Sequence, residues 1–187
     1  MVLPAFVSPL FINMKKMLLA LCLWGLLAGS AAAQKQGSFA KDFLPLWKRS
    51  AAYTLKVAEA MPAEYYIYKP HDEALSFAQQ LVHIAENLYW LNATYVLEEE
   101  NPLGNNRLQN PDKQAVVKQL QNALNYVESS LKDISDSQVA QPLKFGGAQV
   151  DKERIFYLMR DHMTHHRAQA VLYLRLNGME PPRYTGW

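Results

Sequence analysis

The chain has 187 residues, half of them apolar, with 19 basic and 17 acidic side chains. This length and composition suit one well-cored domain and exclude a disordered polymer, while the single cysteine excludes a disulfide scaffold or a cysteine-based zinc finger. Five histidines stand against that cysteine, and three of them fall within five residues near the C-terminus.

The N-terminal segment, residues 1–33, has the composition of a secretory signal peptide. It contains no acidic residue, and two lysines at 15–16 precede an apolar run over residues 17–28. That run is too short to cross about 30 Å of hydrocarbon as a helix, and the alanines at its end provide the small residues that a signal peptidase needs. We therefore expect an exported protein with no stable membrane anchor; an uncleaved anchor is the alternative.

Cleavage is expected after Ala33, which leaves residues 34–187 as the mature chain. Residues 1–13 are interpreted as an over-extended start, because Met14 directly precedes the two lysines. Removing the segment takes away the cysteine and both lysines, so the 19 basic side chains become 17 and equal the 17 acidic ones. A neutral chain with scattered lysines and arginines does not indicate nucleic-acid binding.

Apolar residues recur at helical spacing in four segments of the mature chain. No segment shows the alternation of apolar and polar residues that is typical of strands. The first predicted helix covers about residues 39–60 and stops before Pro62. The second begins near Asp72 and fades at residues 98–100. Clusters of Pro, Gly, Asn and Ser separate the segments, as expected for loops.

The third predicted helix starts with Asn110 as N-cap and Pro111 at the first helical position. A connection at residues 135–147 precedes the fourth helix, over about residues 148–177. None of these helices can bury its apolar stripe alone, so we predict an all-α fold, one four-helix bundle within residues 34–187. The connection is long enough for a crossover, which leaves the order of the helices open.

A metal site is predicted from the histidines. His162 and His166 lie four residues apart on the fourth helix, in a stripe that points both imidazoles into the bundle. At this spacing Cβ atoms are about 5–6 Å apart, close enough for two ring nitrogens to bind one ion at about 2.0–2.1 Å. His83, midway along the second helix, is the best third ligand. Three neutral nitrogens leave coordination positions open, which is typical of catalytic sites. The alternative is a set of hydrogen-bonded core histidines.

Further side chains near these histidines are candidates for contacting a ligand or a substrate: Glu86, Asn87, His165, Arg167 and Gln169. His165 lies about 60° around the helix from His162 and is an alternative ligand. Arg167 could hold an anionic substrate group, although a surface or inter-helix salt bridge is the simpler interpretation.

Four ordered segments carry a family resemblance: MPAEYYIYKP at 61–70, SFAQQLVHIA at 76–85, HMTHHRAQ at 162–169 and LRLNG at 174–178. Together they resemble the DinB superfamily (DinB/YfiT-like) of metal-binding four-helix bundles, over nearly all of the mature chain. Ala168 stands where that family usually has glycine.

The resemblance implies that His83, His162 and His166 bind a divalent metal ion such as Zn, Ni, Fe or Mn. Family members include metal-dependent transferases that use low-molecular-weight thiols such as bacillithiol or mycothiol, and many are homodimers. Those thiols are cytosolic, whereas the signal peptide predicts export. We therefore expect an exported metalloenzyme, a transferase or hydrolase, that activates a thiol or water. A metal- or ligand-binding module without turnover and a helical interaction protein with structural histidines are the alternatives.

Overall fold

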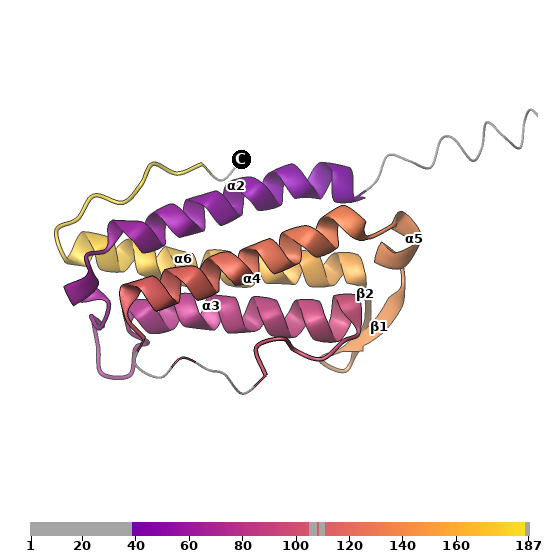
Figure 1. The fold of residues 1–187 in the computed structure, drawn as a ribbon, viewed down its shortest axis with the longest axis horizontal. Coiled ribbons are helices and arrows are strands. Elements are labelled where there is room, and N and C mark those ends of the chain that lie inside the picture. The colour runs from indigo at the N-terminus through magenta and orange to yellow at the C-terminus, as the bar shows by residue number, and fades with distance from the viewer. Residues whose placement is uncertain (1–38, 105–107, 109–110, 186–187) are drawn as a thin grey trace, which may run out of the picture. The chain divides into compact units, whose positions relative to one another are not determined.

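The computed structural model describes residues 39–104, 108 and 111–185, so the predicted signal peptide lies outside the described residues. Four long helices dominate this part of the chain (Figure 1): α2 (Phe39–Ala60), α3 (Phe77–Leu91), α4 (Lys113–Asp133) and α6 (Lys152–Leu176). Within the residues that are described, no helix combines the length and hydropathy that crossing a bilayer requires.

The four helices form a bundle in which each packs against two others: α2 against α4 and α6, and α3 against the same two. The Lys113 ammonium at the start of α4 donates to the carbonyls of Glu59 and Met61 at the end of α2, so these helices are antiparallel. Asn92, just beyond α3, donates to Ser130 near the end of α4, so α3 and α4 are parallel. The order is therefore up-down-down-up (Figure 1). The chain returns along the bundle between α3 and α4, and not at residues 135–147, where the sequence suggested a crossover.

The second helix begins later than predicted. Ser76 caps α3: its hydroxyl accepts from the Gln79 amide, and its own amide donates to the Gln79 side chain. This reciprocal capping box fixes the start at Phe77, five residues beyond Asp72. At its other end α3 continues as a π-helical segment, η2 (Asn92–Leu97).

The η2 segment ends at Glu98, which has a left-handed backbone conformation with φ of 58°. The ammonium of Lys152, at the start of α6, donates to the Val96 carbonyl at 2.9 Å and to Glu98 Oε1 at 2.7 Å. Lys152 therefore joins the beginning of α6 to the end of α3 and satisfies a carbonyl that the end of a helix leaves free.

The third helix also starts later than predicted, because Asp112 is its N-cap and accepts from the Ala115 amide at 2.8 Å. The predicted cap at Asn110 is two residues too early. Aspartate is as good an N-cap as asparagine, and Asn110 and Asp112 lie only two residues apart in the sequence.

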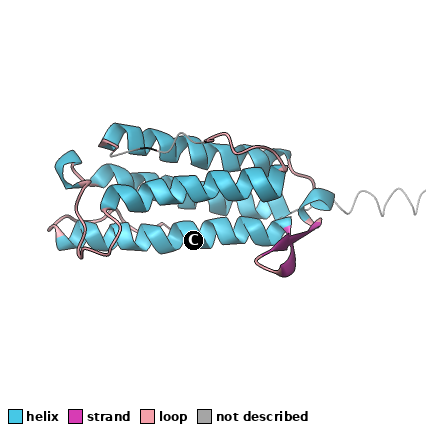
Figure 2. Ribbon diagram, turned by 90° about the horizontal axis from the view of Figure 1, so that it is seen from below, coloured by secondary structure: helices cyan, strands magenta, loops and turns pink. Residues whose placement is uncertain are grey.

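Residues 142–151 contradict the strand-free prediction. After the short helix α5 (Asp136–Val139), β1 (Pro142–Phe145) and β2 (Ala148–Asp151) pair as an antiparallel hairpin at one end of the bundle (Figure 2). Gly146 and Gly147 have positive φ, as a two-residue hairpin turn requires. The hairpin takes the first four residues of the predicted fourth helix, so α6 begins at Lys152.

The core lies between the four helices and is rich in aromatic rings. Its largest fully buried side chains include Trp47, Tyr173, Phe43, Phe77 and Phe156. The Trp47 indole also donates to the Leu124 carbonyl at 3.3 Å, which joins α2 to α4. With the interior filled in this way, polar side chains at the helix contacts stand out as exceptions.

Candidate metal centre

The buried side of α6 is rotated from the predicted stripe. Its fully buried residues include Met159, Met163, Ala170 and Leu174, whereas His162 and His166 are only half-buried. Both imidazoles therefore lie at the edge of the buried stripe, beside α3, whereas the predicted stripe had them within it. A position at the rim of a helix contact suits a ligand that a substrate must reach.

The structure brings the three predicted ligands together. The His83 ring centroid lies 4.9 Å from that of His162 and 4.5 Å from that of His166, and the latter two are 4.5 Å apart. One nitrogen of each ring lies within 4.8 Å of the other two. Two nitrogens bound to one ion at 2.0–2.1 Å lie at most about 4.2 Å apart, so small side-chain rotations suffice.

His162 and His166, two of the three histidines of α6, are neutral at physiological pH. Burial and, to a smaller extent, the neighbouring rings of His83 and His165 together lower the pKa of His162 to about 4. Burial likewise lowers the pKa of His166 to about 4, with His162 as the strongest neighbour. Neutral imidazoles keep a free lone pair, which is the form that binds a metal ion.

A carboxamide that the sequence did not single out fixes one ligand. Gln80, 4% exposed on α3, has its Oε1 2.6 Å from Nδ1 of His166. Gln80 Nε2 donates to the Tyr173 hydroxyl, which donates to the Leu75 carbonyl. Because Oε1 only accepts, His166 carries its proton on Nδ1 and presents Nε2 as the free donor. The sequence offered one clue to this role, which is that Gln80 lies one helical turn before His83 and so on the same face of the helix.

The other candidates lie around the cluster with different burial. His165 is exposed and stacks edge-on against His166, with centroids 4.9 Å apart, so it stays outside the group that can share an ion. Glu86 and Gln169 are half-buried. Asn87 is half-buried too, but its Oδ1 is enclosed and has no hydrogen-bond partner among the described residues.

Arg167 is buried and not at the surface, and among the described residues it joins two helices through hydrogen bonds where the simpler interpretation expected a salt bridge. It is 4% exposed and faces α2, where its guanidinium donates to the Ser50 carbonyl and hydroxyl and to the Thr54 hydroxyl. The guanidinium also lies 5.0 Å from the centre of the Tyr53 ring. Arg167 therefore joins α6 to α2, on the side of α6 away from His83.

The residues present fit a divalent transition metal. Three imidazole nitrogens converge, Gln80 orients the lone pair of one of them, and Nδ1 of His162 is enclosed with no hydrogen-bond partner in the described part of the chain. A ring nitrogen in that position is costly unless something else satisfies the ring. Imidazole donors suit Zn, Fe, Ni and Cu, and they do not suit Ca or Mg.

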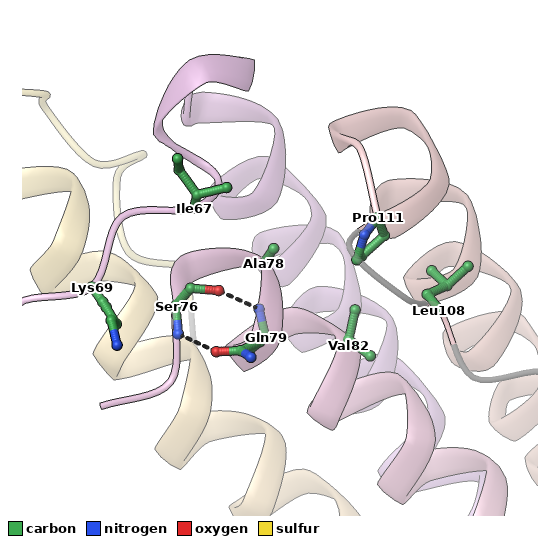
Figure 3. Close-up of a pocket in the computed structure, with 8 residues that line it drawn as sticks. All are labelled: Ile67, Lys69, Ser76, Ala78, Gln79, Val82, Leu108 and Pro111. Atoms are coloured by element: carbon green, nitrogen blue, oxygen red, sulfur yellow. Dashed lines mark hydrogen bonds between the residues drawn. The ribbon is translucent and has the colours of Figure 1, made fainter. Parts of the chain in front are cut away.

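The cavity drawn in Figure 3 is separate from the histidines. It has a volume of about 410 Å³ and opens on another side of α3, beside Val82, with Lys69 and Pro111 on its walls. Ser76 and Gln79, which line it, are bonded to each other as the helix cap. Lys69 contacts the Asp72 carbonyl and carboxylate, so these polar side chains take part in local contacts of the fold, and the candidate chemistry lies at the histidine cluster.

The fold and the cluster together define a class: an up-down-down-up helical bundle with one histidine on the second long helix and an HxxxH pair on the last. The model of the DinB family matches residues 34–187, and the chain belongs to the DinB family.

Solved structures show the same fold. A DinB-like protein from Bacillus cereus ATCC 10987 superposes with a TM-score of 0.68 at 14% identity, over 78% of this chain and 97% of that one. A DinB-like protein (YjoA) from Bacillus subtilis gives a TM-score of 0.65 at 17% identity, over 78% and 99%. None of the curated proteins compared with this chain matches it.

Proposed function

We propose that the protein binds one divalent transition metal ion through His83, His162 and His166 and is an exported metalloenzyme acting on a thiol or water. The convergence of the three imidazoles, each with a nitrogen within 4.8 Å of the others, carries the proposal. An ion held by three neutral nitrogens keeps open positions and supplies Lewis acidity that lowers the pKa of a thiol or water.

The chain's own groups bind and orient. Gln80 holds the His166 ring so that Nε2 faces the cluster, and the Tyr173 hydroxyl holds Gln80 in turn. The half-buried position of His162 and His166 at the rim of the bundle supports access by a substrate. If residues 1–33 are removed, the chain has no cysteine, so a reacting thiol must come from a co-substrate.

Elemental analysis of protein purified without a histidine tag tests metal binding. We expect about one Zn, Ni, Fe or Mn per chain, lost in His162→Ala and retained in His71→Ala. His71 is the matched control because it is exposed in a loop, where its ring accepts from the Glu73 amide. Metal below about 0.2 per chain, unchanged in His162→Ala, would remove the ligand assignment.

Activity requires a separate measurement. A panel of low-molecular-weight thiols with model electrophiles should show conjugation that depends on metal and is lost in His83→Ala. Equal rates in the wild type and the variant, with metal bound to the wild type, would instead define a binding module without turnover.

Export and assembly are proposed on the N-terminal composition and on the family resemblance. Mass spectrometry of the protein secreted by its host should give an N-terminus at Gln34, and light scattering should give twice the chain mass for a homodimer. An intact Met1 or Met14 N-terminus would contradict export.

A further inference from the structure

One face of α3 carries two carboxamides on either side of the metal-ligand candidate. Gln80, His83 and Asn87 are spaced by three and four residues, so they lie in a row along the helix. Gln80 already serves His166 on α6. Asn87 lies one turn beyond His83, so it can contact a different part of α6 from the part that Gln80 contacts.

The helices α3 and α6 are antiparallel. Tyr173, near the end of α6, donates to Leu75 just before α3, and Lys152, at the start of α6, donates to Val96 beyond α3. Residues later on α3 therefore lie beside residues earlier on α6. Gln80 lies beside His166. Asn87, later on α3, therefore lies toward His162, which is one turn before His166 on α6.

Two enclosed polar atoms at this end of the cluster have no hydrogen-bond partner among the described residues: Oδ1 of Asn87 and Nδ1 of His162. They are complementary, because Oδ1 accepts, and Nδ1 donates whenever the other ring nitrogen binds a metal. A buried group of this kind costs about 1–3 kcal/mol if it stays unsatisfied. The two atoms lie on helices that pack against each other, so a contact between them that forms when the ion is bound would satisfy both.

We propose that Asn87 is the positioning residue for His162: its Oδ1 accepts the Nδ1 proton of His162, directly or through one water, while Nε2 binds the metal. The inference rests on the proposed metal site. It gives the two ligands of α6 matching carboxamide supports from α3, Gln80 for His166 and Asn87 for His162. Both supports are uncharged, so neither offsets the charge of the ion as a carboxylate would.

Zn²⁺ affinity, measured on the full chain by competition with a chromophoric chelator, tests this role. Asn87→Leu should bind Zn²⁺ about 10- to 100-fold more weakly, the usual loss when a ligand's supporting hydrogen bond is removed. Asn87→Asp keeps the acceptor and should restore binding to within about 3-fold of the wild type or better.

Asn92→Leu is the matched control. Asn92 is a buried asparagine whose Oδ1, like that of Asn87, has no hydrogen-bond partner among the described residues, but it donates to Ser130 on α4, away from the histidines. Its loss should lower the stability and leave Zn²⁺ affinity within about 3-fold of the wild type. An equal loss of affinity in Asn87→Leu and Asn92→Leu would show a general effect of weakened packing and overturn the proposal.

The nitrogen that binds the ion gives a second readout. In ¹⁵N NMR spectra of the Zn²⁺-loaded protein, His162 should be protonated at Nδ1 and bound at Nε2. Binding through Nδ1, or wild-type affinity in Asn87→Leu, overturns the role of Asn87 while leaving the three-histidine site standing. Failure of the wild type to bind Zn²⁺, with no effect of His162→Ala, overturns both.

Discussion

The two sides of α6 treat polar side chains in opposite ways. Toward α2, Arg167 is almost fully buried and its guanidinium is bonded to two hydroxyls and a carbonyl of that helix. Toward α3, His162 and His166 are half-buried, and enclosed atoms of His162 and Asn87 have no hydrogen-bond partner among the described residues. The polar group on the first side is thus hydrogen-bonded within the fold, whereas polar atoms on the second side are not.

This difference separates structural polarity from functional polarity within one helix. A buried charge that is hydrogen-bonded to the neighbouring helix joins the two helices and specifies how they align. Neutral ring nitrogens that lie close together and lack some hydrogen-bond partners are typical of a binding site, because unsatisfied polar groups do not stabilise the fold. Variants on the two sides should therefore change different quantities.

Arg167→Ala should give the largest loss of stability. It removes hydrogen bonds from a charged donor, leaves Ser50 and Thr54 hydroxyls without that partner, and opens a cavity between α2 and α6. We expect the free energy of unfolding to fall by about 3 kcal/mol, measured by urea denaturation. Zn²⁺ affinity of the folded fraction should stay within about 3-fold of the wild type. A loss below about 1 kcal/mol, or a loss of affinity with stability unchanged, would contradict the structural role.

Gln80→Leu should do the reverse. It removes the acceptor that holds His166 in one tautomer, while the Tyr173 hydroxyl keeps its bond to the Leu75 carbonyl. We expect Zn²⁺ affinity to fall about 10- to 100-fold and the stability of the metal-free protein to change by less than about 1 kcal/mol.

Gln119→Leu is the control for Gln80→Leu, because Gln119 is a buried glutamine of α4 with an unpartnered Nε2. It should bind Zn²⁺ as the wild type does. Equal affinity in all three proteins would show that Gln80 only fills space between α3 and α6.

The sequence predicted the helical part of the fold because the evidence there is periodic. Helix α2 has the predicted bounds, since its stripe is long and Pro62 ends it. The later start of α3 depends on a capping box at Ser76 that competed with the turn at Asp72. The hairpin at residues 142–151 was missed because its strands have four residues each, too few for an alternating pattern to stand out.

The sequence also placed the three histidines, because HxxxH spacing survives any rotation of the helix about its axis. It did not place Arg167 or Gln80. Whether an arginine beside a ligand faces solvent or α2 depends on a small rotation of α6, and the histidines proved to lie at the edge of the buried stripe. Gln80 is distinguished from its neighbour Gln79 only by the tertiary partner that each meets.

The smallest expected effect is on the pH dependence of stability, and it arises from the histidines on the side of α6 that faces α3. In the metal-free protein, burial holds the pKa of His162 and His166 near 4, against 6.5 for an ordinary histidine. Between these values the unfolded chain binds protons that the folded chain does not, so the folded state loses stability as pH falls from about 6.5 to about 4. Above that window neither state is protonated there, and the two histidines contribute no slope.

The loss should be on the order of 1 kcal/mol for each ring, because both remain partly exposed and screened by solvent. Carboxylates such as Glu98, whose pKa is lowered by Lys152, also titrate toward the acid end of this range. The test is therefore to compare how strongly the stability of each protein depends on pH. The stability of the double variant His162→Gln/His166→Gln should depend on pH less than that of the wild type. The stability of His71→Gln should show the same pH dependence as that of the wild type. If stability has the same pH dependence in the double variant as in the wild type, these rings gain protons as easily in the folded protein as in the unfolded chain. The side of α6 that faces α3 would then be as stable without an ion as the side that holds Arg167.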